Sequence, residues 1–145
     1  MILLDTSFLF ALFAEDDANH ARVREALDRY RGRDLYDFVL VTNHVIAETI
    51  TLLRSGVHRD ADVSHRVAVA AGRQLFAGAF GRLHQVSAEE EREAFEYLVR
   101  HRDKHYSFVD CVSFVVMERL GIREALAVDS DSTHRFTALP GPLPK

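Results

Sequence analysis

The chain opens with a short apolar run that ends abruptly at a carboxylate, and this feature most constrains the fold. Ile2 to Leu4 form the run, and Asp5 follows at once with two hydroxyl residues behind it. A short apolar run bounded by polar residues is typical of a strand buried on both faces, as in the middle of a parallel sheet. Such sheets bind ligands outside the carboxyl ends of their strands. Asp5 is therefore a candidate functional residue, and a simple turn or helix cap is the alternative interpretation.

Further strand-like runs alternate with helical patterns along the rest of the chain. We expect strands at residues 38–41, 83–86 and 125–128, a short edge strand at 136–139, and helices at 7–14, 19–32, 43–56, 60–79, 88–102 and 108–121. Alternating strands and helices predict a three-layer α/β/α sandwich with a mostly parallel sheet. We expect one domain over residues 1–139 and a loose, proline-rich tail over residues 140–145.

Composition narrows the class of protein further. The chain has 145 residues, of which 48% are hydrophobic, and this balance is typical of a soluble globular domain. Cys111 is the only cysteine, so an internal disulfide is excluded, and a buried thiol in a reducing compartment is favoured. No apolar stretch has the length of a signal peptide or membrane span, so we expect a cytoplasmic protein. The net charge of −4 argues against broad adhesion to nucleic acid but permits a local basic groove.

Four carboxylates hold comparable positions in this pattern. Asp5 and Asp129 each follow a predicted strand, Asp110 lies in the first turn of a helix, and Glu48 lies in an early turn of another. In a parallel sheet all four can converge at one edge. Two carboxylates about 4 Å apart repel by roughly 4 kcal/mol at an effective dielectric near 20, and a hard divalent cation offsets that repulsion. Such a pocket can hold a metal and its water in line with a phosphodiester.

Each carboxylate also has a plainer interpretation when it is taken alone. Asp110 completes a capping-box pattern with Ser107, and a second such pattern stands at residues 87–90. Glu48 is compatible with a solvated helix position, and Asp129 with Asp131 is compatible with a turn. The joint arrangement favours the metal-binding interpretation.

Four short segments, in order, carry a resemblance to a known family. They are Leu3-Leu4-Asp5-Thr6-Ser7, Thr42-Asn43-His44-Val45-Ile46-Ala47-Glu48-Thr49, Tyr106-Ser107-Phe108-Val109-Asp110-Cys111 and Ala127-Val128-Asp129. Together they resemble the motif blocks of the PIN domain, most closely those of VapC-type toxins from bacterial toxin–antitoxin pairs. The family consists largely of Mg²⁺- or Mn²⁺-dependent ribonucleases with a parallel sheet of about five strands.

The resemblance implies a role for each matching residue. The implied catalytic and metal-binding carboxylates are Asp5, Glu48, Asp110 and Asp129, and the implied hydrogen-bonding supports are Thr6, Ser7 and Asn43. We expect Asp5 and Asp110 to bind the metal directly, and the other two carboxylates to act directly or through waters. The last block departs from the family pattern, because Ala127 stands where Thr or Ser is common and Ser132 where an aromatic is common. Asp131 is therefore an alternative metal ligand.

These observations predict a metal-dependent endoribonuclease, a hydrolase of RNA phosphodiester bonds that acts as the toxin of a type II toxin–antitoxin pair. The resemblance also implies a homodimer and a cognate antitoxin whose C-terminal segment covers the acidic pocket. One alternative is a catalytically weak PIN-like module that binds RNA or protein. Another is an aspartyl-phosphate phosphatase, although Ser7 stands where that class has a second Asp.

Arginines supply the remaining candidate contacts to RNA. Arg59, Arg66 and Arg73 recur every seven residues and would share one helix face. This face is either simply solvated or a phosphate-binding edge beside the acidic pocket.

Overall fold

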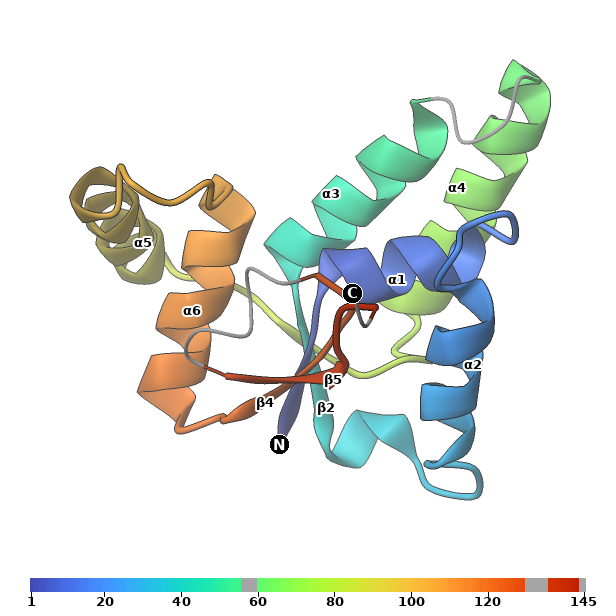
Figure 1. Ribbon diagram of the computed structural model, residues 1–145, viewed down its shortest axis with the longest axis horizontal. Coiled ribbons are helices and arrows are strands. Elements are labelled where there is room, and N and C mark those ends of the chain that lie inside the picture. The colour runs from blue at the N-terminus through green and yellow to red at the C-terminus, as the bar shows by residue number, and fades with distance from the viewer. Residues whose placement is uncertain (56–59, 130–135, 144–145) are drawn as a thin grey trace.

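A parallel β-sheet forms the middle layer of the molecule, with helices on both faces (Figure 1). The computed structural model describes residues 1–55, 60–129 and 136–143. In this part of the chain the strand order is β3-β2-β1-β4-β5, and every neighbouring pair is parallel. The strands are β1 (Ile2–Leu4), β2 (Val39–Thr42), β3 (Arg82–His84), β4 (Glu124–Ala127) and β5 (Thr137–Pro140). The prediction of an α/β sandwich with a five-stranded parallel sheet is confirmed.

Helices connect β1 to β2, β2 to β3 and β3 to β4, and they cover the sheet. They are α1 (Thr6–Phe13), α2 (His20–Asp28), α3 (Asn43–Arg54), α4 (Ala61–Phe76), α5 (Ala88–Arg100) and α6 (Phe108–Leu120), with a short 3₁₀ turn at Leu35–Asp37. In Figure 1, α5 and α6 lie on one side of the sheet, and α1 and α2 lie on the other. The pair α3 and α4 extends away from the sheet as an antiparallel arm.

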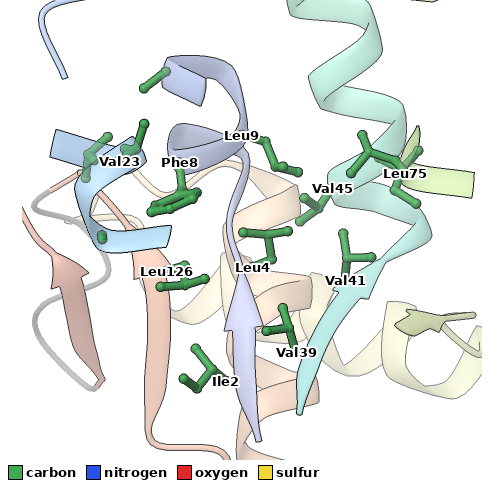
Figure 2. Close-up of a cluster of buried hydrophobic side chains, with 14 residues drawn as sticks. Ile2, Leu4, Phe8, Leu9, Val23, Val39, Val41, Val45, Leu75 and Leu126 are labelled. Carbon is green, nitrogen blue, oxygen red and sulfur yellow. The ribbon is translucent and has the colours of Figure 1, made fainter. Parts of the chain in front are cut away.

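The first strand shows why both faces of the sheet need cover. Ile2 and Leu4 point into the core shared with α1 to α4, whereas Leu3 points into the core shared with α5 and α6. Figure 2 shows the first of these cores, where Phe8 of α1 and Val45 of α3 pack over the strands. Side chains alternate between the faces of a strand, so an unbroken apolar run is what a central strand requires.

The helix ends match their sequence signals closely. Both predicted capping boxes form, one before α5 and one before α6. Gly121 ends α6 with a φ of 66°, a left-handed conformation that glycine adopts without a steric penalty. Cys111 is fully buried in α6, and burial raises the pKa of its thiol to about 11, so it is a structural rather than a nucleophilic residue.

The C-terminal boundary differs from the prediction. The last strand continues through Pro140, one residue beyond the expected end, and the Gly141 N–H donates to the Ala127 carbonyl at 3.0 Å. Arg22 also donates to the carbonyls of Pro140 and Pro142, at 3.3 and 3.5 Å. Proline is tolerated on an edge strand because it needs no ladder N–H there. Residues 140–142 are thus held against the domain instead of forming a loose tail.

No helix in the described ranges has the length and apolar character needed to cross a membrane.

Candidate active site

The site begins where β1 ends, at Asp5. Its backbone N–H donates to the Leu126 carbonyl at 3.0 Å, which places it beside the end of β4. Its side chain caps α1 by accepting hydrogen bonds from the Ser7 N–H at 3.0 Å and the Ser7 hydroxyl at 2.6 Å. Asp5 therefore does cap the helix, as the alternative interpretation predicted. Both hydrogen bonds use the same carboxylate oxygen, so the second oxygen can bind other partners.

Ser7 links two strand ends. While its hydroxyl donates to Asp5, it also accepts a hydrogen bond from the Val128 N–H at 3.1 Å. Val128 lies directly after β4 and directly before Asp129. The hydroxyl therefore holds the segment that carries Asp129 next to the carboxyl end of β1.

Glu48 reaches the same edge from the second turn of α3. The Thr6 hydroxyl donates to its carboxylate at 2.7 Å, across a separation of 42 residues in sequence. Thr6 is buried, so this short contact fixes the direction of the Glu48 side chain. The two hydroxyls behind Asp5 thus serve different carboxylates, Ser7 serving Asp5 and Thr6 serving Glu48.

Asp110 arrives from the first turn of α6. It accepts a hydrogen bond from the Ser107 N–H at 2.7 Å, and its own N–H donates to the Ser107 hydroxyl at 3.0 Å. The box fixes the carboxylate on the first turn of the helix, at the N-terminal end where the helix dipole favours negative charge.

All four carboxylates line one open cavity of about 330 Å³, which we call the acidic cavity. Its lining residues are Asp5, Thr6, Ser7, Phe10, Asp17, Asn19, Glu48, Leu52, Ser107, Asp110, Val128 and Asp129. The parallel sheet explains the convergence, because both strand ends and both helix starts meet at its carboxyl edge.

Asp17 is a further acidic lining residue that sequence reasoning did not select. It lies in the loop between α1 and α2 and accepts a hydrogen bond from the Asn19 N–H at 2.8 Å. The acidic run at residues 15–17 was visible in the sequence, but only the path of the loop brings one member of it to the cavity.

The acidic cavity disfavours the charged form of Asp5, one of its own carboxylates. Burial raises the pKa of the Asp5 carboxyl above its ordinary value of 3.8. Hydrogen bonds from Ser7 act in the opposite direction, while the negative charges of Asp129 and Glu48 add to the rise. No positively charged group of the described residues is among the causes that shift this pKa, so the fold holds Asp5 where its charged form is disfavoured.

The donor set fits a hard divalent cation. Carboxylate and hydroxyl oxygens are the ligands that Mg²⁺ and Mn²⁺ prefer, and the positive charge would relieve the repulsion around Asp5. Across the described residues, no three acidic, histidine or cysteine side chains stand close enough to form a complete ligand set. Mg²⁺ is commonly held by one or two carboxylates and keeps several waters, for which the acidic cavity has room.

The remaining predicted site residues lie elsewhere. The Asn43 side chain accepts a hydrogen bond from the Val86 N–H at 2.9 Å, so it ties the start of α3 to the segment after β3. Arg66 and Arg73 are exposed on α4, whereas the lining of the acidic cavity comes from other elements. Arg59 and Asp131 fall outside the described residues.

Comparisons with known proteins agree with this architecture. Residues 2–138 match the family model of the PIN domain. The 23S rRNA-specific endonuclease VapC20 of Mycobacterium tuberculosis is 39% identical over 131 residues, which make up 90% of this chain and 91% of the relative. Ribonuclease VapC26 of the same organism is 28% identical over 138 residues, or 95% of this chain and 91% of the relative. The crystal structure of VapC20, described as a sarcin–ricin loop cleaving toxin, superimposes with a TM-score of 0.78 at 38% identity, covering 92% of this chain and 93% of that one.

Proposed function

Because the chain belongs to the PIN-domain family, as an endoribonuclease of the VapC toxin type, we propose that its clustered carboxylates form a metal-dependent catalytic site. The carboxylates are Asp5, Glu48, Asp110 and Asp129. A single observation carries this proposal. Segments spread from the first strand to the fourth each bring one acidic side chain to the same cavity, although mutual repulsion opposes that gathering.

The chain's own residues would divide the work by their positions. Asp5 and Asp110 would hold the cation directly, and Glu48 and Asp129 would hold it directly or through waters. When bound, the cation supplies stabilisation of the negative charge that develops on the phosphoryl oxygens, and it favours deprotonation of the attacking water. Ser7 and Thr6 would orient the carboxylates, since each donates a short hydrogen bond to one of them.

The substrate is RNA, and we propose that its target is a structured loop of ribosomal RNA. The support is the identity of 39% with a relative that is named as specific for 23S rRNA. Structured RNA is recognised through loops, shape and backbone contacts, so an overall negative protein needs only a few placed cations. Exposed arginines of α4, Arg66 and Arg73, are the candidates for phosphate contacts.

A nuclease toxin has to be kept inactive in the cell that makes it. We therefore propose a cognate antitoxin whose C-terminal segment covers the acidic cavity, a homodimeric toxin, and a cytoplasmic location where RNA is available. An antitoxin segment that covers this cavity needs basic side chains, because the lining contributes several carboxylates.

The test of the catalytic site is RNA cleavage by the purified protein with Mg²⁺, with Mn²⁺ and with EDTA. We expect cleavage with either metal and none with EDTA, and ribosomal RNA in intact ribosomes should be cut at one position. Asp5→Asn should abolish cleavage, because the amide keeps an acceptor for Ser7 but removes the negative charge that the cation needs.

Asp28→Asn is the matched control. Asp28 lies on α2 and forms an exposed pair with Arg31, so the same chemical change there should leave cleavage intact. A folded Asp5→Asn protein that cleaves RNA as fast as the natural one would overturn the proposed site, and so would cleavage that persists in EDTA.

A further inference from the structure

A second and smaller cavity lies behind the acidic cavity, with a volume of about 30 Å³. We call it the inner cavity. Its lining residues are Leu3, Asp5, Asp110, Ser113, Phe114, Met117, Ala125, Asp129 and Phe136. Most of this lining is apolar and comes from α6 and from strands β1 and β4.

Three carboxylates line both cavities. Asp5, Asp110 and Asp129 belong to the wall of the inner cavity and also to the wall of the acidic cavity. They therefore form a partition, with the open acidic cavity on one side and the small inner cavity on the other. A carboxylate has several acceptor positions on its two oxygens, so each can have partners on both sides.

The wall of the inner cavity also includes a buried hydroxyl that has no hydrogen-bond partner among the residues that the structure describes. Ser113 lies one helical turn after Asp110 on α6, so the two side chains share a helix face. The residue is 3% exposed, and its hydroxyl forms no hydrogen bond with the described residues. A buried hydroxyl without a partner costs folding free energy, so its place in the wall of a cavity points to an occupant.

The size of the inner cavity selects that occupant. A space of this volume admits about one water molecule. A hydrated Mg²⁺ ion is far larger, because the ion keeps several waters in an octahedral shell. We propose that one water molecule occupies the inner cavity, where it accepts a hydrogen bond from the Ser113 hydroxyl and donates its two hydrogens to two of the three partition carboxylates.

This arrangement makes Ser113 a positioning residue for the acidic cavity. That role rests on the proposed metal site. The presence of the water does not depend on the metal site. The water would donate to two of the partition carboxylates from the side of the inner cavity. It would thereby turn the remaining carboxylate oxygens outward, toward the position of the cation. Groups that orient metal ligands from behind typically contribute about 10- to 100-fold to metal affinity.

The matched control is Thr49 on α3. Its hydroxyl is also buried and also lacks a partner among the described residues, but Thr49 is absent from the lining of both cavities. Ser113→Ala and Thr49→Val therefore each remove one buried hydroxyl, and only the first should affect the water and the cation.

The first experiment is a high-resolution crystal structure of the metal-free protein, with thermal unfolding of both variants. We expect an ordered water within about 3.2 Å of the Ser113 hydroxyl oxygen. Thr49→Val should raise the unfolding midpoint, because it removes an unsatisfied group, whereas Ser113→Ala should lower it, because it removes a satisfied one. A dry inner cavity, or a raised unfolding midpoint in Ser113→Ala, would contradict the proposed water.

The second experiment is calorimetric titration of each protein with Mn²⁺. Ser113→Ala should weaken the affinity by about 10-fold at unchanged stoichiometry, and Thr49→Val should leave the affinity unchanged. Reduced stoichiometry would indicate partial unfolding, and unchanged affinity in Ser113→Ala would overturn the positioning role. If the natural protein does not bind Mn²⁺, both the proposed metal-dependent function and the positioning role of Ser113 are contradicted. The crystal structure still tests whether a water occupies the inner cavity.

Discussion

Two helices of this protein begin with the same capping motif, but the acidic residue of each motif has different surroundings. At the start of α5, Ser87 and Glu90 form a capping box, and at the start of α6, Ser107 and Asp110 form another. In each box the serine hydroxyl accepts from the N–H of the acidic residue, which in turn accepts from the serine N–H. The local chemistry of the two boxes is therefore equivalent.

The surroundings of the two carboxylates differ. Glu90 is 6% exposed, and its two oxygens lie 3.1 and 3.3 Å from the ring nitrogen of His84. Burial acts to raise the pKa of Glu90, but hydrogen bonds from Ser87 and His84 outweigh it and lower that pKa. Asp110 instead lines a cavity together with Asp5 and Asp129. A capping box thus fixes where an acidic side chain stands, and the two boxes differ in its neighbours, which are a histidine for Glu90 and further carboxylates for Asp110.

The largest expected difference between the boxes is catalytic. Asp110→Asn keeps an acceptor for the Ser107 N–H but removes the charge from the acidic cavity. We expect RNA cleavage to fall by more than about 100-fold, beyond the usual effect of groups that only support a metal ligand. Single-turnover cleavage with Mn²⁺ measures it. A folded Asp110→Asn protein that retains cleavage within a few-fold would mean that both boxes are purely structural.

The reciprocal change should act on stability. Glu90→Gln weakens the hydrogen bonds of a buried carboxylate with His84 and Ser87, so we expect the free energy of unfolding to fall by about 1–3 kcal/mol. The rate of RNA cleavage should stay the same, because Glu90 is absent from the acidic cavity. Urea unfolding and cleavage assays on one preparation test both statements, and a large loss of cleavage in a folded variant would contradict the division between the boxes.

The cap serines offer a finer comparison. Ser87→Ala and Ser107→Ala should each destabilise the protein by about 1 kcal/mol, since each removes one N-cap hydroxyl. Only Ser107→Ala should also slow cleavage, by about 10-fold, because Asp110 loses the reciprocal hydrogen bond that holds it. Equal cleavage rates in the two variants would show that the box is dispensable for orienting Asp110.

The smallest expected effects concern pH. The folded protein raises the pKa of Asp5, so without a divalent cation this group should favour folding increasingly as the pH falls through the raised value toward 3.8. Glu90 should behave in the opposite way. Its pKa is lowered by folding, so its stabilising contribution is complete above 4.5 and is lost as the pH falls through the lowered value.

Unfolding of three proteins between pH 7 and pH 3 measures these slopes. Asp5→Asn should be more stable than the natural protein at pH 7, and that advantage should shrink as the pH falls. Glu90→Gln should be less stable at pH 7, with a deficit that begins to shrink only below about 4.5. Parallel slopes for all three proteins would show that neither carboxylate changes its pKa on folding.

Much of the fold was predictable because its signals are local. The apolar run before Asp5 indicates a central strand, and Ser107 with Asp110 indicates the start of α6, so both elements match the prediction closely. The strand β3 was less well predicted. The Val86 N–H is taken by the Asn43 side chain, so the strand ends at His84 rather than at Val86. That contact joins distant parts of the chain and has no local signature.

The site was predictable only in part, for the same reason. Asp5 and Asp129 follow recognisable strand ends, and Glu48 and Asp110 lie near recognisable helix starts. The parallel topology then brings all four to one edge of the sheet. Asp17 depends on the path of a loop, and Ser113, although it lies one turn after Asp110, stands among apolar residues of α6 that give no sign of a cavity beside it. Their contributions emerge from packing, which a single sequence does not encode locally.

The position of β1 has a consequence for when the enzyme can become active during its synthesis. β1 is synthesised well before β4, yet the two strands pair, and the Ser7 hydroxyl that donates to Asp5 also accepts from the Val128 N–H, one residue before Asp129. A nascent chain that stops short of β4 lacks one wall of the acidic cavity, because long-range strand pairing waits for its partner. Translation order alone would therefore leave this nuclease without a complete acidic cavity until β4 has been synthesised and has paired with β1.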